Sequence, residues 1–174
     1  MSGLMFFHQL IPTIGLKETR SVTVFERGSL PDRSFGFVEL YCIDPECDCR
    51  RVLINVISNK EASHVATISH SFEPPSSDDI ETEQTFLDPL NPQSRWSTTL
   101  LGLFKDILRD ENYRSRLERH YRTVKAALVD PKHPIHKVIG NASGGTFGRQ
   151  AIDPYAPCPC GSGKKYKWCC RGKE

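Results

Sequence analysis

The sequence predicts an α+β fold in which an antiparallel sheet meander packs against an antiparallel pair of helices, followed by a small C-terminal metal-binding appendage. Three observations predict it. Apolar residues alternate in short segments in the first half of the chain, they recur every three or four residues in the second half, and four cysteines crowd into residues 155–174. A chain of 174 residues, 38% of them hydrophobic, is long enough for one domain with a core and an appendage.

The predicted strands are short segments rich in Val, Ile, Phe and Tyr, separated by Gly, Pro and Asp. They cover residues 21–27, 36–42, 50–57 and 64–72. A turn at residues 58–61 joins the last two, so residues 36–72 predict an antiparallel meander. An exposed acidic connection then follows at residues 73–85.

Two amphipathic helices are predicted by apolar residues at helical spacing. The first carries Trp96, Leu100, Leu103, Phe104 and Ile107, and the second carries Tyr113, Leu117, His120, Tyr121, Val124 and Leu128. The short connection near Asp110 predicts antiparallel neighbours whose apolar faces cover one side of the sheet. We expect His120 to be a hydrogen-bonded core histidine, with no catalytic role.

The tail reads APCPCGSGKKYKWCCR from residue 156 to residue 171. Its thiols follow a C-x-C-x8-C-C pattern, in a segment too short for a hydrophobic core but suited to folding around a metal ion. Glycines in GSG allow a tight reversal, and a helical turn at residues 164–168 carries the second thiol pair back towards the first. Four thiolates match the closed tetrahedral shell of structural zinc, and the ligands are Cys158, Cys160, Cys169 and Cys170.

This run resembles the SEC-C motif, the zinc-binding tail of the bacterial translocase motor SecA and of many other bacterial proteins. The residues that match are CPCGSGKKYK at 158–167, followed by Cys169 and Cys170. In that family the last ligand is often histidine, so Cys170 changes the expected shell from three sulfurs and a nitrogen to four sulfurs. The resemblance implies zinc binding and a protein partner, because in translocase motors this tail binds the SecB chaperone and the ribosome.

A second thiol cluster, Cys42, Cys47 and Cys49, lies in the segment YCIDPECDCRRVLINV. A hairpin here brings the three sulfurs to one end, and a fourth ligand would complete a second zinc site. If the next turn falls at residues 59 and 60, position 70 lies opposite position 49, which makes His70 the first candidate. His64, Asp44 and Asp48 follow it. The alternative is three free buried cysteines, but the polar loop argues against burial.

The expected organisation is a body at residues 1–140, a flexible linker at 141–154 and the zinc motif at 155–174. The tail carries five Lys or Arg and one Glu, a net charge of +4, which leaves −2 for the rest of the chain. The body also resembles, through FLDPLNPQS and YRSRLERHY, the N-terminal part of bacterial SEC-C-containing proteins of unknown function, which implies no activity.

These features predict a zinc-binding cytoplasmic adaptor that docks a protein partner through its tail. The chain contains no apolar run of membrane-spanning length, and its start lacks the features of a signal peptide. The first alternative is RNA binding, since lysines interleave with Tyr166 and Trp168. The second is a zinc-dependent enzyme at Cys42, Cys47 and Cys49. We do not expect an enzyme or a small-molecule substrate, because no phosphate-binding glycine loop, nucleophile elbow or H-E-x-x-H motif occurs.

Overall fold

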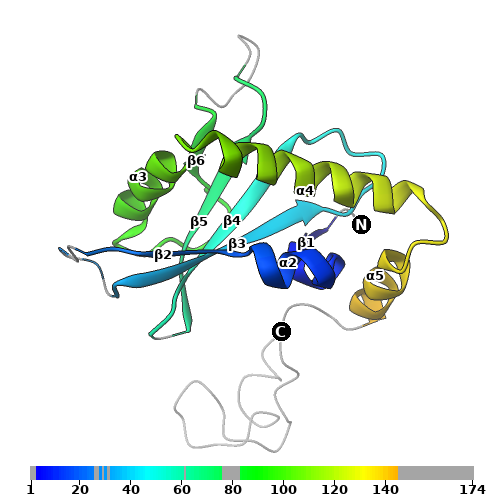
Figure 1. Ribbon diagram of the computed structural model, residues 1–174, viewed down its shortest axis with the longest axis horizontal. Helices are drawn as coiled ribbons and strands as arrows, with labels where there is room; N and C mark the ends of the chain where they lie inside the picture. Colours follow the sequence, from blue (N-terminus) through cyan, green and yellow to red (C-terminus); the bar gives the residue numbers. More distant parts are fainter. Residues whose placement is uncertain are drawn as a thin grey trace, which may run out of the picture. The chain divides into compact units, whose positions relative to one another are not determined.

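In the computed structural model, which describes residues 3–25, 28, 30, 32–60, 62–75 and 83–144, the core element is a six-stranded antiparallel sheet (Figure 1). Its strand order is β1-β3-β4-β5-β6, and β2 pairs with β3 beside β1. The α+β prediction is confirmed. The strands are β1 (Leu4–Phe6), β2 (Arg20–Thr23), β3 (Ser34–Cys42), β4 (Arg51–Ser58), β5 (Ser63–Ser71) and β6 (Thr85–Leu87).

The helices of the described residues are α1 (Phe7–Leu10), α2 (Pro12–Glu18), α3 (Ser97–Ile107), α4 (Glu111–Val129) and α5 (Ile135–Gly144). Sequence reasoning missed β1, α1, α2 and β6, which are all short. Proline starts α2, where its lack of an N–H does no harm. Gly15 allows α2 to lie against α1, because a Cβ at this position would lie 2.4 Å from the Cα of His8.

The core lies between the sheet and the helices α3 and α4. Alternate residues of β3 and β4 point to this face, as the two-residue period of a strand requires. Phe37 of β3 stacks on Phe104 of α3 with ring centroids 5.7 Å apart. The fully buried side chains of this layer include Phe35, Phe37, Tyr41, Val52, Ile54, Val56, Leu100, Phe104, Leu117 and Val124.

Helices α3 and α4 both cover the sheet, but each packs on it separately. Helix α3 contacts β5 and β6, whereas α4 crosses β4 and reaches α1 (Figure 1). Asp110 ends the connection in an extended conformation and caps α4 by accepting a hydrogen bond from the Asn112 N–H at 3.0 Å. The chain thereby leaves α3 in a new direction, and α3 and α4 lie over different strands of the sheet.

The β4–β5 connection decides the register of the meander. Strand β4 ends at Ser58 and β5 begins at Ser63, so four residues separate them, and Ala62 has a positive φ of 48°. The register also shifts between Val56 and Ile57. As a result Arg51 lies opposite Ser71, a pairing that a two-residue turn at 59 and 60 does not produce.

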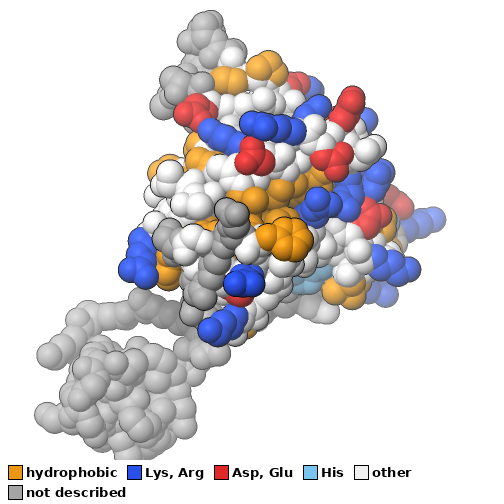
Figure 2. All heavy atoms as spheres, turned by 60° about the vertical axis from the view of Figure 1, so that its left-hand side comes forward, with side chains coloured by type: hydrophobic (Ala, Val, Ile, Leu, Met, Phe, Trp, Pro, Cys, Tyr) orange, Lys and Arg blue, Asp and Glu red, His pale blue; other side chains and the backbone are white. Residues whose placement is uncertain are grey.

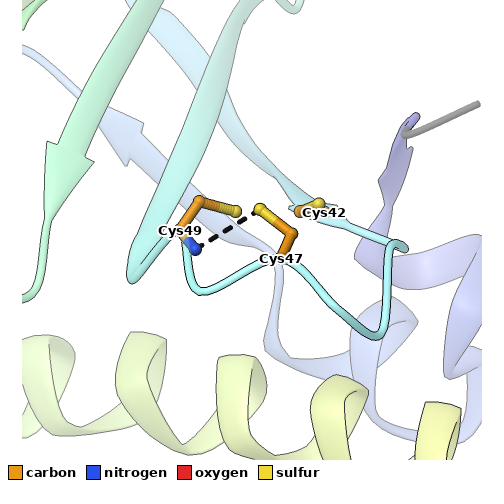
Figure 3. Close-up of side chains that lie close together, drawn as sticks. All are labelled: Cys42, Cys47 and Cys49. Atoms are coloured by element: carbon orange, nitrogen blue, oxygen red, sulfur yellow. Dashed lines mark hydrogen bonds between the residues drawn. The ribbon is translucent and has the colours of Figure 1, made fainter.

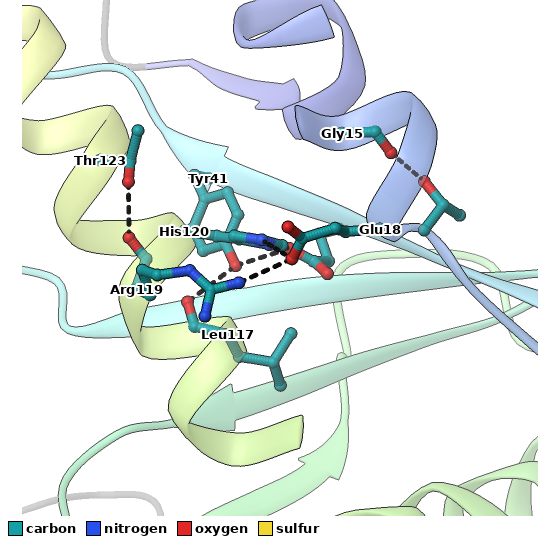
Figure 4. A network of polar contacts seen from close by, with 9 residues as sticks. Gly15, Glu18, Tyr41, Leu117, Arg119, His120 and Thr123 are labelled. Atoms are coloured by element: carbon teal, nitrogen blue, oxygen red, sulfur yellow. Dashed lines mark hydrogen bonds and ion pairs between the residues drawn. The ribbon is translucent and has the colours of Figure 1, made fainter. Parts of the chain in front are cut away.

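A buried polar cluster joins α2, β3 and α4 (Figure 4). His120, only 1% exposed, lies 2.7 Å from Glu39 Oε2 through Nδ1 and 3.0 Å from Glu18 Oε2 through Nε2. The Tyr41 hydroxyl is 2.8 Å from the same Glu39 oxygen and 3.0 Å from the Leu117 carbonyl. The prediction that His120 is a hydrogen-bonded core residue is confirmed.

Helix α5 extends through Gly144, so helix occupies the first four positions of the stretch expected to be a linker at 141–154. The rest of that stretch lies outside the described residues. Among the described helices, none combines the length and the apolar character that crossing a membrane requires.

Candidate metal centre

The body site lies in the loop between β3 and β4. Asp44 and Pro45 start a turn in which the Cys47 N–H donates to the Asp44 carbonyl at 3.3 Å, with proline at a position that suits its fixed φ. The Asp44 side chain accepts from the Glu46 N–H at 3.0 Å. Since β3 ends at Cys42, this turn brings the chain back across the end of the strand.

The three thiols converge at this point (Figure 3). The sulfurs of Cys42, Cys47 and Cys49 all lie within 4.8 Å of one another, and the Cys49 N–H donates to Cys47 Sγ at 3.4 Å. In a tetrahedral shell with Zn–S bonds of about 2.3 Å, sulfurs lie about 3.8 Å apart. The thiols therefore need to move by only about 1 Å to bind one ion.

Lys125 of α4 forms hydrogen bonds to the backbone of this loop. Its ammonium group donates to the Asp44 carbonyl and to the Cys47 carbonyl, each at 2.8 Å. These contacts join residues about eighty positions apart, and Tyr121, one turn earlier on α4, has its ring centroid 5.9 Å from Lys125 Nζ. Sequence reasoning missed Lys125, because nothing in a helical pattern indicates which lysine meets a distant loop.

The pKa values of Cys47 and Cys49 are shifted in opposite directions. Burial raises the pKa of Cys49 to about 12, and hydrogen bonding with Cys47 and Cys42 adds to the rise. Hydrogen bonds from the side chain and N–H of Cys49, with a smaller effect of the Lys125 charge, lower the pKa of Cys47. Grouped thiolates repel one another, so a thiophilic divalent cation is the partner that stabilises all three in the ionised form.

His70 does not join the thiols. It pairs with Val52 rather than with position 49, because the longer turn and the irregularity in β4 shift the register. Its Nδ1 lies 2.8 Å from the Thr85 hydroxyl, and its ring contacts Phe104 on the helix-covered face. The prediction that His70 lies opposite position 49 is wrong.

The other fourth-ligand candidates have different partners. His64 lies at the far end of β5, opposite Ile57, and its Nε2 is 2.8 Å from the Thr67 hydroxyl. Asp44 caps the loop turn, and Asp48 forms an ion pair with Arg50 at 3.3 Å. Within the described part of the chain, the only group of three or more metal-binding side chains is the thiol triplet.

The remaining predicted ligands, Cys158, Cys160, Cys169 and Cys170, lie outside the described residues. A comparison with known families covers that part of the chain. Residues 156–172 match the SEC-C motif. The match confirms the resemblance carried by the cysteine spacing, and SEC-C is a metal-binding motif. No solved structure matches the chain.

Proposed function

We propose that this protein is a zinc-binding cytoplasmic adaptor whose body is fastened by one zinc ion and whose SEC-C motif, held by a second, docks a protein partner. The observation that carries the proposal is the convergence of three thiols to within 4.8 Å in a body attached to a SEC-C motif. Two separate thiol sets in one chain favour a metal-dependent architecture.

Zinc fits the body site best among common metals. Thiolates are soft ligands, which favour zinc, copper(I) and iron–sulfur clusters over magnesium or calcium. Zinc has no geometric preference of its own and tolerates three protein sulfurs with a fourth ligand from elsewhere.

The body zinc has a structural role in this proposal. The loop already has a turn, a side-chain cap and two hydrogen bonds from Lys125, so a bound ion adds a cross-link between the end of β3 and the start of β4. Glu46, the loop glutamate next to Cys47, is exposed, so no buried base is placed beside the sulfurs by this residue. These features favour structure over catalysis.

The SEC-C motif supplies the docking surface. Its basic and aromatic side chains follow one another at residues 164–168, and related tails bind proteins. A metal-closed knob of this kind offers a rigid shape at little entropic cost, which favours specific recognition. The partner class that fits is a protein with an acidic surface, since the tail carries a net charge of +4.

Zinc content measured by mass spectrometry on the purified full chain tests the metal part. We expect two zinc ions per chain, one after Cys47→Ser with Cys49→Ser, and one after Cys169→Ser with Cys170→Ser. His70→Gln is the matched control, and it should retain two. One zinc in the unmodified chain, unchanged by Cys47→Ser with Cys49→Ser, would remove the body site from the proposal.

Affinity capture tests the adaptor part. The full chain and a chain lacking residues 155–174 are each used to capture proteins from a cell lysate, and mass spectrometry identifies what each recovers. A protein partner recovered with the full chain should be lost without the tail. Labelled single-stranded RNA is titrated in parallel at low salt. Equal recovery with and without the tail contradicts the adaptor, and tight RNA binding that the tail deletion abolishes favours the nucleic-acid alternative.

A further inference from the structure

A hollow of about 400 Å³ lies where β5 and β6 meet the end of α3 and the start of α4, and the three thiols do not line it. Its walls include His70 and Thr85 from the strands, and Lys105, Arg109 and Arg114 from the helices and their connection. The volume falls in the range of small-molecule sites. The hollow thus combines buried polar groups with three cations and one carboxylate, Glu83.

The strand side of the hollow is ordered for hydrogen bonding. His70 is 5% exposed, and its Nδ1 lies 2.8 Å from the hydroxyl of Thr85, which is also buried. When that hydroxyl donates to Nδ1, the ring proton of a neutral imidazole is on Nε2. Phe104 and Phe72 hold the ring edge-on at 6.3 and 5.9 Å between centroids, so its orientation is determined by packing.

The helix side carries a surplus of positive charge. Lys105 pairs with Glu83 at 2.7 Å, and Arg109 pairs with Asp106 at 3.2 Å. Arg114, by contrast, donates from Nη1 to a neutral group, the Leu108 carbonyl, at 2.5 Å. The three cations and two carboxylates leave a net charge of +1, which belongs to Arg114.

Arg114 also acts on the histidine. Burial, together with a smaller effect of the Arg114 positive charge, lowers the pKa of His70 to about 4. The imidazole is therefore neutral at physiological pH and can donate its N–H without adding charge. An anion placed beside both groups would offset the Arg114 charge and accept that hydrogen bond.

The surroundings favour a small ligand over a polyanion. Seen from the α3 side, the body shows Lys and Arg next to Asp and Glu, with apolar side chains between them (Figure 2). A continuous basic surface of the kind that tracks a nucleic-acid backbone is not visible on this face. The hollow instead offers one cation, Arg114, near a buried imidazole, His70.

We propose that this hollow binds the oxyanion group of a small molecule, a phosphate or a carboxylate, between the Arg114 guanidinium and the Nε2–H of His70. An arginine fork matches oxyanion geometry, and a charge-assisted hydrogen bond is stronger than a neutral one. Thr85 is a positioning residue in this proposal, because donation from its hydroxyl to Nδ1 places the ring proton on Nε2. The proposal is independent of the metal sites.

Titration of the full chain with inorganic phosphate, and separately with acetate, tests it by nuclear magnetic resonance of the His70 ring. We expect saturable shifts of the ring signals and an upward shift of the His70 pKa at saturation. A lower dissociation constant for phosphate assigns the site to phosphate groups, and a lower dissociation constant for acetate assigns it to carboxylates. No saturable shift with either anion overturns the proposal.

Three variants locate the binding. Arg114→Gln should weaken binding at least tenfold, and Thr85→Val should weaken it while retaining the arginine. Arg122→Gln, which removes an exposed cation elsewhere on α4, is the matched control and should leave binding unchanged. Equal weakening in the control would show general charge screening and refute the site, and amide spectra of each variant establish that the body remains folded.

Discussion

Removal of the Lys125 ammonium group should weaken zinc binding at the body site without unfolding the body. The change is Lys125→Met, which keeps the length and apolar stem of the side chain. It removes two hydrogen bonds to the Asp44 and Cys47 carbonyls, both 2.8 Å long. It also removes a positive charge that contributes to lowering the pKa of Cys47.

The magnitude follows from where those carbonyls lie. A hydrogen bond to a charged group contributes about 1.5–3 kcal/mol, but the loop is partly exposed and water can replace the lysine. A net loss of about 1.4–2.7 kcal/mol in metal binding corresponds to tenfold to a hundredfold, which is the usual effect of residues that orient metal ligands. Lys125→Arg keeps the charge and the donors, so it should lose less than Lys125→Met.

The assay is competition between the protein and a chelator of known zinc affinity. It uses a chain with Cys158, Cys160, Cys169 and Cys170 changed to serine, so that only the body site reports. Lys105→Met, which removes a lysine paired with Glu83 on α3, is the control and should leave the affinity unchanged. An affinity within twofold of the parent for Lys125→Met would refute the idea that this lysine holds the site together.

Three further predictions concern stability. Cys169→Ser with Cys170→Ser removes the tail metal, whose binding energy is on the order of 10 kcal/mol in comparable small sites, and should leave the thermal transition of the body unchanged by circular dichroism; a fall of many degrees would mean that tail and body unfold together. His70 has a pKa of about 6.5 in the unfolded chain and of about 4 in the folded chain, so only the unfolded chain binds a proton between these values. The free energy of unfolding should therefore fall by about 3 kcal/mol as the pH is lowered from 6.5 to 4, and His70→Gln should remove this pH dependence. His120→Leu removes the buried imidazole that contacts the Glu39 carboxylate, which is 4% exposed, and leaves Tyr41 as the other buried partner, so the free energy of unfolding should fall by about 3 kcal/mol. An unchanged urea midpoint would refute the idea that this contact stabilises the body.

The elements that could be predicted are those whose apolar pattern repeats several times. Strands β3, β4 and β5 and helices α3 and α4 lie within about two residues of the predicted segments, because each shows at least two periods of alternation or helical recurrence. The segment from Leu4 to Leu10 was missed because it holds a three-residue strand followed directly by one turn of helix. Neither element is long enough to show a period.

Arrangement was harder to predict than elements. The connection between α3 and α4 is short, and a short connection favours an antiparallel pair. The capped, extended Asp110 redirects α4 across the sheet, where Tyr41 and Glu39 provide buried polar partners for its inner face. Such partners come from residues some eighty positions away, so the pattern of α4 alone does not contain them.

At the metal centre too, the contacts within one loop could be predicted, whereas the contact that depends on a second hairpin could not. Cys42, Cys47 and Cys49 are joined by one loop, so their convergence follows from a hairpin and a proline turn that the sequence shows directly. Placing His70 opposite position 49 required the register of a second hairpin, and the observed partner of His70 is residue 52, three positions further on. A shift by an odd number of residues moves a side chain to the other face of the sheet. The histidine therefore leaves the thiols and faces the helices, where it lines the hollow beside Arg114.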